Sequence, residues 1–154
     1  MSSLPPSDTL PAADDVGAVA AHLRIGVTRL ARILRRQGDT GLSPSQLSAL
    51  TAVDRHQPVT LGALADHEQV APPTITNVVA KLEVLGLLER RADAGDRRVT
   101  KVVTTPAGAA LLAQVRQRKD VWLATRLAGL DPDRRARLAA AIEVIDDLTR
   151  QEAP

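Results

Sequence analysis

Aliphatic residues recur at every third or fourth position along most of this chain, which is the pattern of helices that each bury one face. The first stripe runs from Val16 to Leu34 and predicts a helix that ends near Gly38. Further helices are predicted to begin at Pro44, Leu61, Pro72, Pro106 and Pro132. Residues 1–13 show no such period and are rich in Ser and Pro, so we expect a disordered lead-in. A mainly α single domain is then expected over residues 14–154.

Two of these helices have recognisable start signals. Ser43 and Gln46 have the spacing of a capping box, and Pro44 suits the first helical position. Pro72 and Pro73 open the fourth helix, where a missing N–H group costs little because it would be unpaired anyway. Ala71 is a weak N-cap by propensity, but the two prolines leave it few donors to satisfy.

One segment departs from the helical pattern. Residues 89–108 read ERRADAGDRRVTKVVTTPAG, and their centre, Asp93-Ala94-Gly95-Asp96, favours a tight turn. Val and Thr are abundant after the turn, so strands are predicted at 87–91 and 98–104, forming a lone hairpin. Five basic residues crowd this ribbon: Arg90, Arg91, Arg97, Arg98 and Lys101.

The helix that precedes the hairpin has two unlike faces. Its apolar face is predicted to contain Ile75, Val78, Val79, Leu82 and Leu85. The opposite face holds Pro73, Thr76, Asn77, Ala80 and Lys81, with Thr74 at the N-terminal edge. A solvent-facing helix would usually carry long Glu and Lys side chains that pair along the surface. This short, polar face can instead approach another surface closely.

Composition narrows the functional classes. With 154 residues, 44% of them hydrophobic, the chain suits one core. One Trp and no Phe or Tyr disfavour single-strand binding by base stacking, and the absence of Cys removes disulfides and thiol redox sensing. No Ser-His-Asp set, carboxylate pair or Gly-rich phosphate loop indicates an enzyme. No secretion signal and no apolar run of about 18 residues is present, so we expect a cytoplasmic protein without a membrane partner.

The three histidines, His22, His56 and His67, indicate a metal site only weakly. The triplet Asp66-His67-Glu68 does not converge on one ion, because neighbouring residues of a helix point about 100° apart. We therefore expect no metal and no cofactor.

The net charge of +2 is small, and all but three of the 20 basic residues are arginine. A GC-rich coding sequence also favours arginine, so composition alone does not establish a nucleic-acid partner. Residues 41–105 contain seven basic and seven acidic residues. DNA binding would therefore depend on positive charge clustered at the hairpin and on helix N-termini.

Two helices joined by a tight turn and followed at once by a basic hairpin predict a winged helix-turn-helix. The segments Leu82–Leu87, Asp93–Arg98 and Thr105–Gly108 match, in register, the motifs of the MarR family of bacterial transcriptional regulators, which the chain resembles over about residues 14–150. The resemblance implies a winged core at about 41–105 and dimerisation helices at about 14–38 and 106–150. The sequence departs from the family at Asn77 and Gly95, where other residues are common.

The resemblance also implies roles for particular residues. In the family, an arginine at the position of Arg98 enters the DNA minor groove and the carboxylate at Asp96 holds it, with Arg97 beside it. On the recognition helix, Asn can bond adenine and Thr can meet a phosphate or a thymine methyl group. The predicted contacts of that helix are Pro73, Thr74, Thr76, Asn77 and Lys81.

The expected function is that of a homodimeric repressor that binds double-stranded DNA at a pseudo-palindromic operator. The family further implies a small apolar or phenolic anionic effector that relieves repression. The alternative is a winged-helix module that binds proteins and has lost DNA binding, with the hairpin as a docking ribbon.

Overall fold

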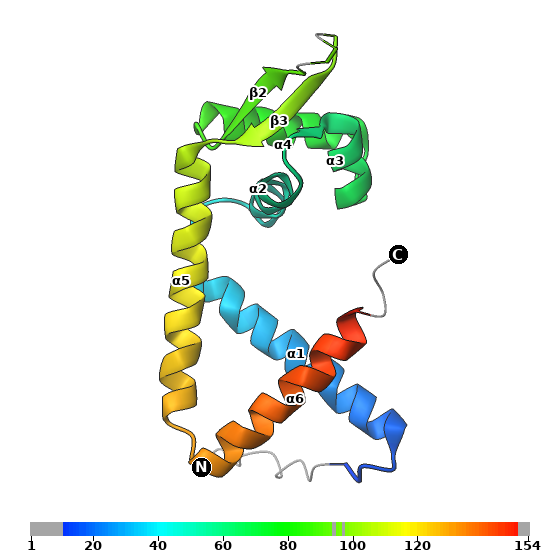
Figure 1. Ribbon diagram of the computed structural model, residues 1–154, viewed down its shortest axis with the longest axis vertical. Helices are drawn as coiled ribbons and strands as arrows, with labels where there is room; N and C mark the ends of the chain where they lie inside the picture. Colours follow the sequence, from blue (N-terminus) through cyan, green and yellow to red (C-terminus); the bar gives the residue numbers. More distant parts are fainter. Residues whose placement is uncertain (1–10, 94, 97, 151–154) are drawn as a thin grey trace, which may run out of the picture. The chain divides into compact units, whose positions relative to one another are not determined.

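The computed structural model describes residues 11–93, 95–96 and 98–150, so most of the expected lead-in lies outside the described residues. The elements in chain order are α1 (Val16–Gln37), α2 (Pro44–His56), β1 (Val59–Thr60), α3 (Leu61–Glu68), α4 (Pro72–Val84), β2 (Leu88–Ala92), β3 (Thr100–Thr104), α5 (Pro106–Ala128) and α6 (Pro132–Arg150) (Figure 1). The chain divides into two compact units, one up to Gln37 and one from Gly38 onward. The predicted fold class, mainly α with a small antiparallel sheet, is confirmed.

The expectation of a lone hairpin is wrong, because a third strand joins the sheet. β1 pairs with β3 on the side opposite β2, and Val59 lies across from Val102. The side chain of Gln57 adds to this edge, since its Oε1 accepts a hydrogen bond from the Thr104 N–H at 2.8 Å. A strand of two residues has no detectable period, so the sequence could not reveal it.

The core of the larger unit lies where α2, α3 and α4 meet the sheet. Its fully buried side chains include Leu50, Val53, Leu64, Ile75, Val79, Leu82 and Val102. Figure 1 shows α3, α4 and the β2–β3 hairpin in the same lobe, and α4 contacts both neighbours. The core thereby fixes α4, the expected recognition helix, against the ribbon formed by β2 and β3.

Both predicted helix starts are confirmed. The Ser43 side chain accepts from the Gln46 N–H at 3.2 Å, and the Gln46 side chain accepts from the Ser43 N–H at 2.8 Å, which completes the capping box. Ala71 makes no side-chain cap at the start of α4. Leu85 differs from the prediction: it is 55% exposed, because α4 ends at Val84 and the chain turns away at Gly86.

A junction of hydrogen bonds joins the end of α4 to the start of α5. Gly86 has φ +70°, and the Leu87 N–H bonds to the Leu82 carbonyl at 2.9 Å, which closes the helix. The Thr105 hydroxyl donates to the Gly86 carbonyl at 2.6 Å and accepts from the Gly108 N–H at 3.1 Å. A Cβ at Gly108 would lie 2.2 Å from the Leu87 oxygen, so only glycine fits this contact.

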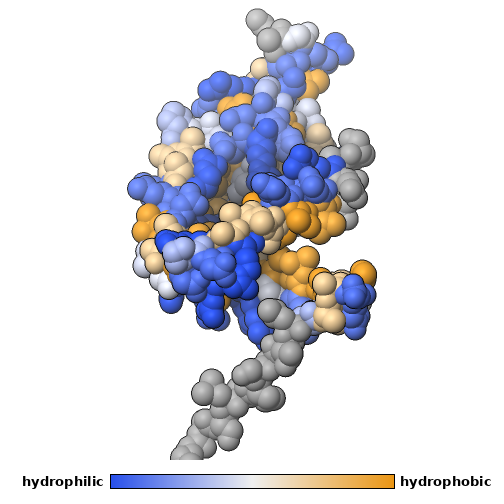
Figure 2. Space-filling model, turned by 60° about the horizontal axis from the view of Figure 1, so that its bottom comes forward, coloured by the Kyte–Doolittle hydropathy of each residue, from blue (hydrophilic) through white to orange (hydrophobic). Residues whose placement is uncertain are grey.

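The outer helices leave apolar surface uncovered. Neither α1 nor α6 contains a buried residue. Leu138, Ile142 and Leu148, which form an apolar stripe along α6, are exposed, as are apolar positions of α1 such as Val19 and Leu23. Apolar areas at the surface are orange in Figure 2. Within the described residues, no helix is long and apolar enough to cross a membrane.

Candidate nucleic-acid interface

The outward face of α4 is exposed along its length. Pro73, Asn77, Ala80 and Lys81 lie on it, as the helical period predicts. Val84 extends the same face and is 89% exposed, which sequence reasoning missed although it lies seven residues after Asn77. Within the described part of the chain, the Asn77 side-chain amide makes no hydrogen bond. Its donors and acceptor are therefore available to an outside partner.

The two threonines are placed differently from the other predicted contacts. Thr76 is half-buried, and its hydroxyl donates to the Pro72 carbonyl at 2.8 Å, so its proton is already engaged. Thr74 is exposed at the edge of the helix and lines a hollow of about 360 Å³ beside Ser45 and Ser48 of α2. Thr74 and Thr76 therefore flank the outward face rather than lie at its centre.

The N-terminus of α4 offers few amide donors. Pro72 and Pro73 have no N–H group, and the Thr74 N–H already bonds to the Ala71 carbonyl at 2.9 Å. An anion near this end would feel the helix dipole but would find no free N–H in the first three residues. The expected help from helix N-termini is thus weaker at α4 than the sequence suggested.

The tip of the β2–β3 hairpin is a turn organised by Asp96. Its Oδ1 accepts from the Arg98 N–H at 2.9 Å, and its carbonyl accepts from the Val99 N–H at 2.9 Å. The resemblance implied that this carboxylate holds the arginine, and the contact described is with the Arg98 backbone. The Arg98 side chain is exposed. Arg97 lies outside the described residues.

Carboxylates neutralise most of the basic residues at the base of the ribbon. Glu83 lies 3.2 Å from Arg90, Asp93 lies 2.8 Å from Lys101, and Glu89 pairs with Arg91. Arg98 forms no ion pair with any residue that the structure describes. The unpaired positive charge of the described ribbon is therefore concentrated at its tip, and the five basic residues do not act as one cluster.

An exposed helix face with a free amide, next to a ribbon with an unpaired guanidinium at its tip, can meet DNA at two places. A helix of this size fits the major groove, and an arginine on a narrow ribbon fits the minor groove. The fold and this pairing define the class: the protein is a winged helix-turn-helix DNA-binding protein.

The comparisons with known proteins identify the family. The MarR family model matches residues 42–100. An HTH-type transcriptional regulator of Mycobacterium leprae is 38% identical over 136 residues, covering 88% of this chain and 95% of that protein. The chain belongs to the MarR family, and it is a DNA-binding transcriptional regulator rather than an enzyme.

Solved structures agree with this assignment. A crystal structure of a transcriptional regulator from Pseudomonas aeruginosa has a TM-score of 0.76 and 35% identity, covering 90% of this chain and 98% of that one. A MepR mutant of Staphylococcus aureus bound to an oligodeoxyribonucleotide has a TM-score of 0.67 at 20% identity, covering 84% and 96% of the two chains. MepR has also been solved with ethidium bromide, and that structure has a TM-score of 0.61. At this identity, the MepR structures show the fold alone.

Proposed function

We propose that the protein is a homodimeric repressor that binds a pseudo-palindromic operator through two recognition helices and two wings. The observation that carries the proposal is the unpaired Arg98 at the ribbon tip, in the same lobe as the free amide of Asn77. Asn77 and Lys81 would face the major groove with Pro73 beside them, while Thr74 and Thr76 would contact the groove edges. Asp96 would hold the turn that presents Arg98, and Arg97 would add charge. A regulator of this kind acts where the chromosome lies, so we place it in the cytoplasm.

Two-fold symmetry follows from the charge of the module and from its uncovered helices. A winged core with equal numbers of acidic and basic residues has little long-range attraction for DNA, so one copy would bind weakly. In a dimer, binding of one winged core holds the second core near its half-site, which raises the effective concentration of the second core. α1, α5 and α6 would form the dimer, and the half-sites would lie about one helical turn, 10 base pairs, apart.

The decisive variant is Arg98→Ala. A minor-groove arginine responds mainly to groove width and potential, so its loss should weaken binding to many sequences and reduce the salt dependence by about one charge per wing. Arg137→Ala is the matched control, because Arg137 pairs with Asp133 on α6 and is not among the proposed DNA contacts. The measurement is operator affinity at two salt concentrations, with circular dichroism to verify folding.

The same experiment distinguishes this function from the second candidate, a protein-interaction module. If Arg98→Ala binds every DNA sequence as the parent does, the ribbon is not a DNA wing and the protein-interaction module becomes the better reading. Selection of binding sites from random DNA by the parent protein would provide the operator for these measurements.

A small-molecule effector belongs to the proposal. Such a ligand would act by favouring a spacing of the two lobes that misfits the operator. The exposed apolar positions of α1, such as Leu23 and Val27, and the arginines at the end of the same helix, Arg35 and Arg36, support an apolar, anionic compound, whereas the ethidium bound by MepR is a planar aromatic cation. A panel should therefore contain phenolic acids and planar cations. A panel that changes neither operator affinity nor melting temperature would indicate constitutive repression.

A further inference from the structure

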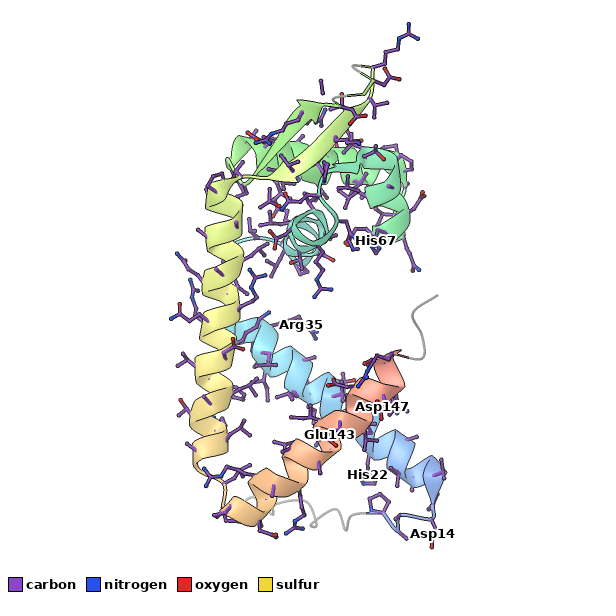
Figure 3. The ribbon with its side chains drawn as sticks, viewed as in Figure 1. Asp14, His22, Arg35, His67, Glu143 and Asp147 are labelled. Atoms are coloured by element: carbon purple, nitrogen blue, oxygen red, sulfur yellow. The ribbon has the colours of Figure 1, made fainter. Side chains whose placement is uncertain are left out.

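Two histidines that are distant in sequence meet at the surface of the winged lobe. His56 is the last residue of α2, and His67 lies in the last turn of α3. Their Nε2 atoms are 2.6 Å apart, and their rings lie with centroids 4.1 Å apart at an angle of 48°. Both residues are exposed, and His67 is labelled on α3 in Figure 3. The pair is therefore accessible from solvent.

The facing nitrogens can be satisfied in two ways. If the contact between the two Nε2 atoms is a hydrogen bond, one of them must carry a proton and the other must accept it. If both rings instead carry their proton on Nδ1, two lone pairs point into the same small space. Imidazole nitrogen is a good ligand for Zn²⁺, Cu²⁺ and Ni²⁺, and two such lone pairs can chelate one ion.

The distance between the two Nε2 atoms is close to what such an ion requires. A metal–nitrogen bond of about 2.0–2.1 Å places two nitrogens of a tetrahedral ion about 3.3 Å apart. The pair would have to open by several tenths of an ångström from its present 2.6 Å. Because both side chains are exposed, small rotations about their side-chain bonds can provide this change without moving the helices.

The two histidines would hold the ion together with water. Within the described residues, no group of three His, Cys, Asp or Glu side chains is arranged to hold a metal. Asp66 and Glu68, the neighbours of His67, point elsewhere on the helix, as their spacing requires. The remaining coordination positions would therefore be open to solvent, as expected for a weaker site than a closed four-ligand zinc site.

We propose that His56 and His67 form a chelating site for one divalent transition-metal ion, with Cu²⁺ and Zn²⁺ as the ions that suit two imidazoles. The ion would tie the end of α3 to the end of α2 and stabilise the lobe that carries the recognition helix. This site is independent of the DNA contacts, so it stands whether or not the proposed operator binding is correct.

The test compares three histidine variants of the full-length protein. His56→Gln and His67→Gln each remove one ligand. His22→Gln is the matched control, because His22 is the third histidine of the chain and contacts only the Ala18 carbonyl of its own helix, at 3.0 Å. Titration calorimetry with Zn²⁺ should give one ion per chain for the parent and the control. Loss of an outer partner alone typically weakens metal affinity about tenfold or more, so loss of a direct ligand should weaken it further.

Two further readouts keep the proposal falsifiable. Zn²⁺ should raise the melting temperature of the parent and of His22→Gln, but not of the other two variants. The electron paramagnetic resonance spectrum of bound Cu²⁺ should show two imidazole nitrogens in the parent and one in each ligand variant. Equal affinities in all three variants would overturn the proposal. So would a two-nitrogen signal that disappears on dilution, because the ligands would then come from different chains.

Discussion

At the scale of single residues, Asn77 and Arg98 would present two different kinds of chemistry to DNA in the proposed complex. The Asn77 side chain has two donors and an acceptor on an exposed helix face, which suits reading a base edge. Arg98 carries an unpaired charge at the end of a turn, which suits a groove whose potential matters more than its sequence. The two residues should therefore contribute differently to specificity and to general affinity.

Asn77→Ala should lose about 1–3 kcal/mol per half-site on the preferred operator and hardly change binding to mismatched operators. The reason is that only the correct base offers a partner to the amide. Lys81→Ala is the matched control on the same helix, because a lysine contact with phosphate would weaken binding to all sequences alike. Affinity across single-base operator variants would distinguish the two patterns. A uniform loss for Asn77→Ala would mean that this residue does not read a base.

Gly108 is a residue whose importance is structural. In Gly108→Ala, the new Cβ would lie 2.2 Å from the Leu87 carbonyl oxygen and 2.9 Å from the Thr104 methyl group, and the Leu87 backbone cannot move aside as a flexible side chain can. We expect a loss of at least about 1–3 kcal/mol in the free energy of unfolding. Gly62→Ala on α3 is the control, since a Cβ there meets nothing within 4 Å. Urea denaturation of both variants measures the difference, and equal stabilities would contradict the contact.

At the scale of elements, the end of α4 and the start of α5 are held together by the junction around Thr105. The Thr105 hydroxyl serves two elements at once, because it caps α5 at Gly108 and also bonds the carbonyl of Gly86 after α4. This double role gives a physical reason for the segments Leu82–Leu87 and Thr105–Gly108 to occur together.

Thr105→Val keeps the shape of the side chain but removes both hydrogen bonds. We expect the unfolding free energy to fall by about 1–2 kcal/mol, as for other lost helix caps. Thr125→Val is the control, because the Thr125 hydroxyl bonds only the Val121 carbonyl of its own helix, and its loss should stay within about 0.5 kcal/mol. Chemical denaturation would compare them. A Thr105→Val protein as stable as the control would show that the junction contributes little.

The elements also show which features a sequence reveals. Every helix start was predictable, because stripes and caps are local: Ser43, Thr60 and Thr105 are all side-chain caps in the structure. β1 and the meeting of His56 with His67 were not, because each depends on residues brought together only by the packing of the core. The orientation of Thr76 toward Pro72 was also not predictable, since a helical period gives a direction but not a hydrogen bond.

The candidate site likewise has features that the sequence reveals and features that depend on the fold. The outward placement of Pro73, Asn77 and Lys81 follows from the period alone. The ion pairs at the base of the ribbon needed the fold in two of three cases, because Lys101 with Asp93 crosses the hairpin and Arg90 with Glu83 joins β2 to α4, whereas Arg91 with Glu89 lies along one strand. The placement of charge at the ribbon tip is therefore a property of the fold.

At the scale of the whole molecule, the uncovered stripe of α6 calls for a partner surface. Ile142 is 50% exposed and Leu138 is 39% exposed, so burying the part that remains exposed would contribute about 1 kcal/mol each, roughly half the value for a fully exposed side chain. A second copy of the chain is the partner that the proposed two-fold operator requires.

Ile142→Glu should dissociate the dimer, because a charge would have to be buried in an apolar contact. Ala140→Glu is the control, since Ala140 lies on the opposite side of the same helix, about 200° from Leu138. Light scattering and operator titration measure both proteins, and deletion of residues 131–154 should give the monomer outright. A truncated chain that stays dimeric and binds its operator with full affinity would rule out this role for α6.

The junction at Thr105 fixes the start of α5 to the winged lobe, so the helix transmits any tilt along its length. Leu112 is buried in the core of the winged lobe, and Arg116 pairs with Asp54 of α2, so the first half of α5 turns with the lobe. The 23 residues of the helix span about 35 Å, and a tilt of about 5° moves its far end by about 3 Å. In the proposed dimer, a small rotation at the distant end of α5 would therefore change the distance between the two winged lobes.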